Sequence, residues 1–337
     1  MAKQTLPQSP GAELPYAQGQ VALASTGWLA RLRSRLGSLL EDERFLFVLL
    51  VAPTLLVLVA FLAVPFFWGV WLSVSDKVVG RPGTFVGLQN FLTILDSSIF
   101  RRTVQNTFVY TGVATVFKLV LGMALALLLN RQFRFNRLVR ASMLLPWIVP
   151  TVLSALAWLW IFDATYSVLN WILREIGLAR PLWKLGIAPS PRGFIWLGGP
   201  AIAMGSVIAV NVWRGFPFFA ITLLAGLQTI DPELHEAAAI DGAGGWAKFW
   251  YITLPLLRPI LTVVLLFSII VTFADFQLVY VLTRGGPHNS THLFATLAYQ
   301  IGVISGKLGE GAAVSLFMFP VLLLAVILQL RYIRKEE

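Results

Sequence analysis

The chain has 337 residues, of which 57% are hydrophobic and only 12% are charged. Soluble domains usually have about a quarter of their residues charged, so this composition indicates a protein surrounded by lipid. The absence of cysteine excludes disulfides, cysteine-ligated metals and thiol nucleophiles, and three histidines leave little for a histidine metal site. The net charge of +10 does not indicate nucleic-acid binding, because the cations lie beside apolar runs and form no basic stripe interleaved with aromatic residues.

The first 44 residues are mostly polar, and they lack the apolar core and cleavage site of a secretory signal. We therefore expect residues 1–44 to form a retained, flexible tail. A helix needs roughly 20 apolar residues to cross a bilayer, and six later runs meet that length. They predict an all-α integral membrane protein with six transmembrane helices within residues 45–333, and a short tail at 334–337. The six runs are residues 45–74, 104–129, 141–162, 200–227, 260–282 and 312–330.

Two features refine this topology. The first run contains Pro53 and Pro65, which we expect to kink its helix. Lysine and arginine concentrate in cytoplasmic segments of membrane proteins, and close-set cations in a short loop weigh most. The short segment between the second and third runs carries such a group, so it predicts that this segment and both termini are cytoplasmic. The group is Arg131, Arg134, Arg137 and Arg140.

Residues 230–259 are then cytoplasmic too, yet they are net acidic where cations are expected. Asp231 stands as a helix N-cap before Pro232, and Gly242, with the glycines that follow it, provides a sharp turn. Residues 246–252 can form a second short helix before Pro255. We expect a helix–turn–helix across the cytoplasmic face. Periodicity alone fits equally well a helix lying on lipid headgroups, although acidic residues facing anionic lipid argue against that alternative.

Three short motifs in this segment indicate a more specific role for the predicted helix–turn–helix. They are Glu236-Ala237-Ala238, Asp241-Gly242-Ala243 and Ile252-Thr253-Leu254-Pro255. Together they resemble the EAA loop of binding-protein-dependent ABC importer permeases, which implies a coupling helix in a cleft of an ATP-hydrolysing subunit. The coupling residues implied are Glu236, Ala237, Ala238, Asp241, Gly242, Gly244 and Pro255. The aromatic residues Trp246, Phe249 and Trp250 are expected to anchor the second helix by burial.

Other segments are similar to the same family, at residues 85–91, 145–150 and 282–287. They point to the maltose, oligosaccharide and glycerol-phosphate type, with the type I ABC importer permease fold, and to its six-helix members. The resemblance implies a second homologous permease, a homodimeric ABC ATPase, an extracytoplasmic solute-binding protein and a prokaryotic inner membrane. The sequence has no GxxxxGK[ST] phosphate-binding loop. We therefore expect a non-catalytic subunit without cofactor, whose partner ATPase binds ATP and magnesium.

Three ionisable residues lie within the predicted spans, where a charge costs several kcal/mol and normally faces a cavity or a partner. Arg214 and Asp275 could pair across helices as a gate. For Lys118, which has a long aliphatic stem, we expect a local structural or snorkelling role. A central arginine could also bind an anion such as glycerol phosphate, but Asp275 would weaken that attraction. A neutral sugar or polyol is therefore the preferred solute, and the anion is the alternative.

The family resemblance also implies substrate contacts near the middle of the third, fourth and fifth spans. Aromatic faces can stack on a sugar ring while amide, hydroxyl and carboxylate groups bond its hydroxyls. Each such residue taken alone could equally serve helix packing. The candidate pathway residues are Trp147, Thr151, Asn211, Arg214, Gly215, Thr272, Asp275 and Phe276.

Two other functions compete with the importer. In an ion-driven secondary transporter, Asp275 and Lys118 would be coupling groups, but the acidic loop would have no explanation. In a membrane enzyme, Asp275 would act with His288 and His292. The spacing of these histidines suits a metal only on a helix, and their segment is typical of a loop.

Overall fold

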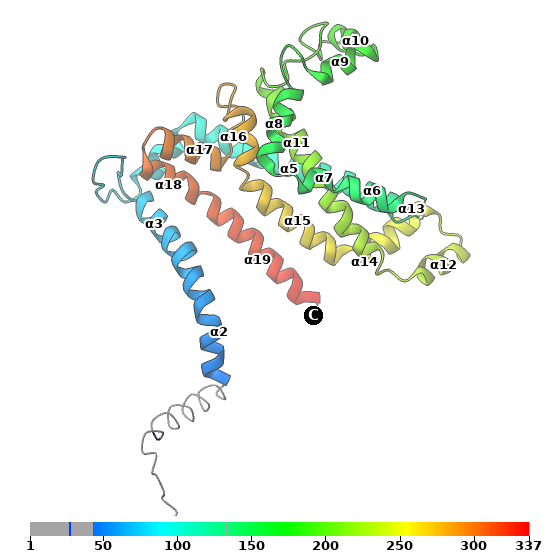
Figure 1. The fold of residues 1–337 in the computed structure, drawn as a ribbon, viewed down its shortest axis with the longest axis horizontal. Helices are drawn as coiled ribbons and strands as arrows, with labels where there is room; N and C mark the ends of the chain where they lie inside the picture. The colour runs from blue at the N-terminus through cyan, green and yellow to red at the C-terminus, as the bar shows by residue number, and fades with distance from the viewer. Residues whose placement is uncertain (1–26, 28–42, 132–133, 337) are drawn as a thin grey trace, which may run out of the picture. The chain divides into compact units, whose positions relative to one another are not determined.

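The computed structural model describes residue 27 and residues 43–131 and 134–336, and this part of the chain is helical without a β-strand. Figure 1 shows the described elements as helices, and their contacts divide the chain into two compact units, with the boundary in the chain between Pro65 and Phe66. Most of the predicted tail at residues 1–44 lies outside the described residues. The C-terminal helix continues to Glu336, so it includes most of the residues expected as a second tail.

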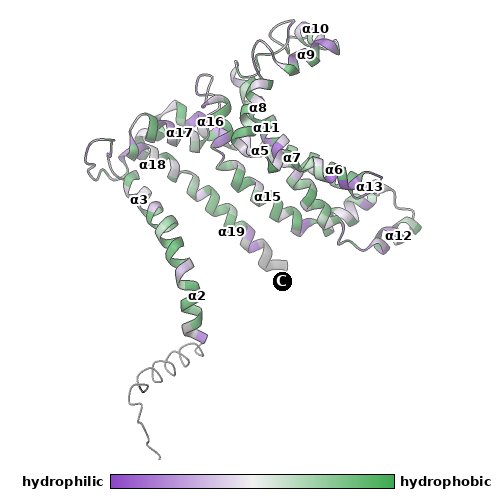
Figure 2. Ribbon diagram, viewed as in Figure 1, coloured by the Kyte–Doolittle hydropathy of each residue, from purple (hydrophilic) through white to green (hydrophobic). Residues whose placement is uncertain are grey.

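The first unit contains α2 (Glu43–Leu58) and a π-helical turn, η1 (Val59–Ala63), and α3 (Val64–Ser73) begins at its end. Leu46–Ser73 is apolar and long enough to cross a membrane, and its large side chains are exposed, as on a helix that faces lipid (Figure 2). Pro53 lies inside α2 without ending it. Pro65 follows the wide turn η1, and Leu46–Ser73 continues past both prolines as one helix.

In the second unit, two single helices and the run Leu308–Gln329 are also long and apolar enough to cross a membrane. Two helix pairs are bent, by 93° after Ile148 and by 70° after Leu256, and each pair could form one more span. Four to six spans result, in agreement with the six predicted from sequence. The long helices of this unit are α5 (Ser98–Leu129), α11 (Pro200–Leu227), α15 (Arg258–Phe273), α18 (Leu308–Leu316) and α19 (Met318–Glu336).

The bends have local causes. Val149 precedes Pro150 and is extended, with ψ 131°, because a residue before proline avoids the helical region. At the second bend, Leu257 is followed two residues later by Pro259. Two predicted spans are therefore wrong in detail. Residues 141–162 do not form one straight helix, and residues 260–282 are interrupted at positions 274–276, where the chain leaves the helix.

The remaining helices are short and lie between the long ones. Most of them carry too few consecutive apolar residues to be identified as spans. They are α4 (Gln89–Asp96), α6 (Asn136–Met143), α7 (Leu145–Ile148), α8 (Thr151–Ile161), α9 (Val168–Glu175), α10 (Ala179–Lys184), α12 (Pro232–Ile240), α13 (Gly245–Lys248), η2 (Phe249–Thr253), α14 (Leu254–Leu256), α16 (Gln277–Thr283), α17 (Phe294–Tyr299) and η3 (Gln300–Ile304).

The core of the second unit is centred on α5 and α11, which pack closely along their length. One cluster of buried side chains joins Leu129 of α5 and Leu223 of α11 to Val264 of α15. Gly226 of α11 lies against Leu257, whose side chain is fully buried at the 70° bend. Packing of Leu257 against α11 therefore stabilises the bend.

Gly122 allows the close approach of α5 to α11. A Cβ atom at this position would collide with the Cβ of Phe219 and would lie 3.2 Å from the backbone nitrogen of Ala220. We expect Gly122→Ala to lower the free energy of unfolding by about 1–3 kcal/mol, because overpacking forces helices apart. Gly112→Ala is the matched control on α5, since its Cβ would have no neighbour within 4 Å. Thermal melting in detergent should separate the two variants, and equal melting temperatures would contradict this account of the interface.

Candidate functional site: a polar cavity and an exposed helix–turn–helix

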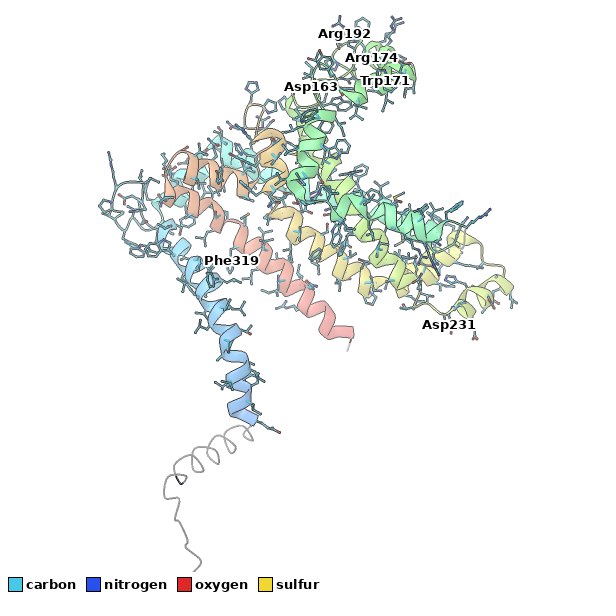
Figure 3. All side chains as sticks on the ribbon, in the orientation of Figure 1. Asp163, Trp171, Arg174, Arg192, Asp231 and Phe319 are labelled. Atoms are coloured by element: carbon cyan, nitrogen blue, oxygen red, sulfur yellow. The ribbon has the colours of Figure 1, made fainter. Side chains whose placement is uncertain are left out.

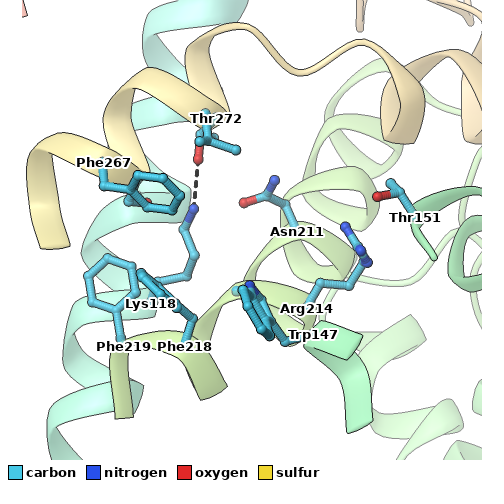
Figure 4. Close-up of a pocket in the computed structure, with 12 residues that line it drawn as sticks. Lys118, Trp147, Thr151, Asn211, Arg214, Phe218, Phe219, Phe267 and Thr272 are labelled. Carbon is cyan, nitrogen blue, oxygen red and sulfur yellow. Dashed lines mark hydrogen bonds between the residues drawn. The ribbon is translucent and has the colours of Figure 1, made fainter. Parts of the chain in front are cut away.

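A cavity of about 250 Å³ lies among α5, α7, α8, α11 and α15 of the second unit (Figure 4). Its wall combines aromatic rings with side chains that form hydrogen bonds. The Trp147 ring stacks on Phe218, with centroids 5.6 Å apart, and Phe218 also packs against Phe267. The twelve lining residues are Lys118, Trp147, Thr151, Asn211, Arg214, Gly215, Phe218, Phe219, Phe267, Ser268, Val271 and Thr272.

Six of the eight residues expected along a substrate pathway line this cavity. They are Trp147, Thr151, Asn211, Arg214, Gly215 and Thr272. Asp275 does not line the cavity, but its carboxylate accepts a hydrogen bond from the lining residue Asn211. Phe276 does not line it. The helix break at residues 274–276 places its ring on Tyr280 and Tyr299, beside a separate pocket of about 430 Å³.

The carboxylate of Asp275 is held by three donors from different parts of the fold. The Tyr110 hydroxyl of α5 donates to Oδ2 at 2.7 Å, and the Asn211 amide of α11 donates to the same oxygen at 3.2 Å. The backbone N–H of Leu278, in the first turn of α16, donates to Oδ1 at 3.3 Å. The break between α15 and α16 is thereby tied to both central helices.

Arg214 does not form the expected ion pair with Asp275. Among the described residues, Lys307 and Glu310 form the one ion pair, at 2.9 Å. The guanidinium of Arg214 instead donates to the carbonyl oxygen of Val149 at 3.2 Å. That carbonyl is available because Pro150 interrupts the helix at the bend between α7 and α8. In place of the predicted ion pair with Asp275, Arg214 therefore forms a hydrogen bond that stabilises the bend between α7 and α8.

Lys118 does not snorkel, because its side chain points into the protein and is only 4% exposed. Its ammonium donates to the Thr272 hydroxyl of α15 at 2.7 Å, as Figure 4 shows. Gly215 makes room for the lysine stem, since a Cβ there would collide with it. Sequence reasoning missed this residue as part of the cavity. The available signal was its charge, because an ionisable residue inside a predicted span normally faces a cavity or a partner.

The segment from Asp231 to Pro255 has the predicted helix–turn–helix form. The Asp231 side chain (Figure 3) accepts a hydrogen bond from the Glu233 N–H at 3.0 Å and so caps α12. Gly242, with φ +80°, makes the turn that follows, and Gly244 caps α13. The side chains of Glu236 and Asp241 are exposed, and neither forms an ion pair with another described residue.

The aromatic residues of this segment differ from expectation. Phe249 packs against the core cluster of α5, α11 and α15, as predicted. Trp246, however, is 75% exposed and Trp250 47% exposed, because α13 is only four residues long and lies beyond the core. Ala237 and Ala238 lie inside α12, and Pro255 lies in α14. Most of the coupling residues implied by the EAA-like motifs are thus exposed on the surface of this chain.

Comparison with known proteins agrees with this fold. Residues 118–335 match the family described as binding-protein-dependent transport system inner membrane component. The trehalose/maltose transport system permease protein MalF of Thermococcus litoralis is 36% identical, and the alignment covers 84% of this chain and 92% of that protein. The sulfoquinovosyl glycerol transport system permease protein SmoG of Agrobacterium fabrum is 34% identical, with 88% and 92% covered.

A solved bacterial ABC transporter involved in the import of the acidic polysaccharide alginate contains a chain with the same fold. The TM-score is 0.73 at 24% identity, and the match covers 89% of this chain and 99% of that one. The resemblance identified from the EAA-like segment is therefore confirmed at the level of family and fold. The chain belongs to the binding-protein-dependent transport system inner membrane components, the multi-pass permease subunits of ABC importers.

Proposed function

We propose that this chain forms half of the translocation pathway of an ATP-driven importer for a carbohydrate or polyol. The observation that carries the proposal is the cavity, which lies between helices of membrane length and places a stacked aromatic wall beside Asn211, Thr272 and charged side chains. Sugars need this mixture, because their rings have apolar faces and polar edges. The names of two relatives refer to trehalose and maltose and to sulfoquinovosyl glycerol, which are carbohydrates.

In this proposal the segment Asp231 to Pro255 couples the pathway to a partner. The exposed helix α12 enters a cleft on one subunit of a homodimeric ABC ATPase, which binds ATP and magnesium, while this chain performs no catalysis. A second homologous permease completes the pore, and an extracytoplasmic solute-binding protein delivers the solute. Closure of the ATPase moves both coupling segments, and the helices alternate between inward-facing and outward-facing states.

The proposed orientation places both termini and the coupling segment in the cytoplasm of a prokaryote, with the chain in the inner membrane. It rests on the four arginines between α5 and α7, since cations gather on the cytoplasmic side. The six pathway residues on the cavity wall, together with Asp275, would contact or position the solute. Phe276 would act from the neighbouring aromatic cluster.

The test of coupling is charge reversal at Glu236. We expect Glu236→Lys to lower ATP-driven uptake at least about tenfold, because an exposed carboxylate that pairs with partner cations becomes a repelling charge. Affinity purification from mild detergent should recover an ATPase and a second permease with the unchanged chain, and less ATPase with the variant. Uptake into proteoliposomes gives the rate.

Glu175→Lys is the matched control, since Glu175 is also an exposed helical glutamate but lies in α9, far along the chain from the coupling segment. It should leave both the recovery of ATPase and uptake unchanged. If the chain instead purifies alone and transports solute on an ion gradient, it is a secondary transporter and the proposal fails.

A further inference from the structure

We propose that the cavity binds the acidic group of an anionic carbohydrate, with Lys118 and Arg214 as the two cations that hold it. The inference rests on the proposed function, because it names the solute class for the same cavity. Figure 4 shows the two side chains on either side of Asn211 and Trp147, so a sugar in contact with the aromatic wall would lie between them. No single element supplies this arrangement, since Lys118 comes from α5 and Arg214 from α11.

The first argument is charge. The twelve residues that line the cavity include two cations and no aspartate or glutamate. The nearest acid in the network, Asp275, does not line the cavity and already accepts three hydrogen bonds, from Tyr110, Asn211 and Leu278. It forms no ion pair with a described cation. One negative charge nearby cannot neutralise two positive ones, so the wall retains a positive charge that an anion would balance.

The second argument is the balance of donors and acceptors. An ammonium has three N–H groups, and that of Lys118 has one hydrogen bond, to Thr272. A guanidinium has five, and that of Arg214 has one, to the carbonyl of Val149, while its buried Nε has no partner among the described residues. The wall therefore has a surplus of charged donors. A carboxylate or sulfonate supplies acceptors for several of them and a charge opposite to the excess positive charge, whereas the hydroxyls of a neutral sugar supply no charge.

The third argument is size. A cavity of about 250 Å³ is smaller than the roughly 300–1,000 Å³ typical of sites for drug-sized ligands, so it suits one sugar residue better than an oligosaccharide. The stacked rings of Trp147 and Phe218 offer an apolar face to such a ring. This conclusion reverses the preference for a neutral solute drawn from sequence. That preference weighed Asp275 against Arg214 alone, whereas the cavity wall carries a second cation, Lys118, against the same single carboxylate.

The test compares glucuronic acid with glucose, which differ only in the group at C6, and adds inorganic phosphate as an anion without a sugar ring. Dissociation constants are measured by calorimetry on the full chain in lipid nanodiscs at low and high salt. We expect glucuronate to bind at least about tenfold more tightly than glucose, with a smaller ratio at high salt. Phosphate should bind more weakly than glucuronate, because it cannot stack on the aromatic wall.

Variants assign the preference to the cavity. Lys118→Met and Arg214→Met should each reduce the ratio to near one, whereas Lys118→Arg, which keeps the charge, should retain most of it. Arg192→Met removes an exposed cation outside the cavity (Figure 3) and should leave the ratio unchanged. Thermal melting checks that each variant is folded. If Arg214→Met does not fold, because it loses its bond to Val149, Lys118→Met still carries the test.

Every other result overturns the inference. Equal binding of glucuronate and glucose would show that the cavity does not distinguish an anionic sugar from a neutral one. Binding of phosphate as tight as that of glucuronate would show an anion site without selectivity for a sugar. A preference for glucuronate that persists in both methionine variants would show that the binding site lies elsewhere. If none of the three probes binds, the proposed site does not exist. None of these results decides whether the chain works with an ATPase, because that is judged by co-purification and the Glu236→Lys variant.

Discussion

Replacing Gly242 with proline is expected to abolish ATP-driven uptake while the chain still reaches the membrane. Gly242 has φ +80°, and proline is restricted to about −65°. Its N–H also donates to the carbonyl of Ala239 at 3.1 Å, and proline has no N–H to donate. The turn between α12 and α13 would therefore be lost, and with it the fixed relation between the coupling helix and α15. In proteoliposomes, ATP hydrolysis should continue without solute entry.

Two alanine variants provide a matched comparison. Gly80 has φ +81°, and at both Gly80 and Gly242 an added Cβ would have no neighbour within 4 Å. The cost of alanine at each position is then the backbone cost of a left-handed residue, about 1–2 kcal/mol. We expect Gly242→Ala to lower uptake and Gly80→Ala to leave it unchanged. Uptake that is normal in Gly242→Pro would refute a coupling role for this segment.

The second large effect concerns the buried carboxylate. Asp275→Leu should lower the free energy of unfolding by at least about 3 kcal/mol, since it removes the acceptor of the Tyr110 hydroxyl, the Asn211 amide and the Leu278 N–H. Each donor left buried without a partner costs about 1–3 kcal/mol. Uptake should also be lost, because the break between α15 and α16 is no longer tied to α5 and α11. Thermal melting of the purified chain measures the stability.

A double-mutant cycle separates the network from simple loss of packing. Tyr110→Phe removes one donor, so combining it with Asp275→Leu should cost clearly less than the sum of the two single changes. Asp275→Asn, which keeps the size and one acceptor oxygen, should fall between the original chain and Asp275→Leu. Strict additivity of Tyr110→Phe and Asp275→Leu would mean that the observed hydrogen bond contributes nothing to stability.

Sequence reasoning predicted the spans and the helix–turn–helix at residues 231–255 because each has a strong local signal. Apolar runs of membrane length predict helices, and an aspartate before proline followed by a glycine turn predicts the ends of α12. The breaks were harder to locate. Pro217 lies within α11 without interrupting it, whereas residues 274–276 leave the helix with no proline present. Asp275 accounts for this difference, because its carboxylate bonds the N–H of Leu278 at the start of α16.

The cavity was only partly predictable for a related reason. The pathway residues came from a family resemblance that marks positions along single helices. Lys118 and Phe267 became part of the wall through packing between helices that are distant in sequence, and no spacing along one helix encodes that contact. Charge alone predicts that Arg214 pairs with Asp275. It failed because Tyr110 and Asn211 already occupy the carboxylate, and because a bend offers Arg214 the carbonyl of Val149.

The bend at Leu257 connects α15 to the short helices α13 and α14 at one end, while the other end of α15 contributes to the cavity wall. This helix of 16 residues rises about 24 Å, and its last turns carry Ser268 and Thr272 of the cavity wall. On the proposed coupling, a displacement of α13 and α14 would tilt α15 about this bend. In the same way, a tilt of α15 would displace α13 and α14. On the proposed coupling, a solute that favours one tilt changes the affinity for nucleotide by the same factor that nucleotide changes the affinity for solute. Solute binding in the permease would thus change nucleotide binding in the partner ATPase.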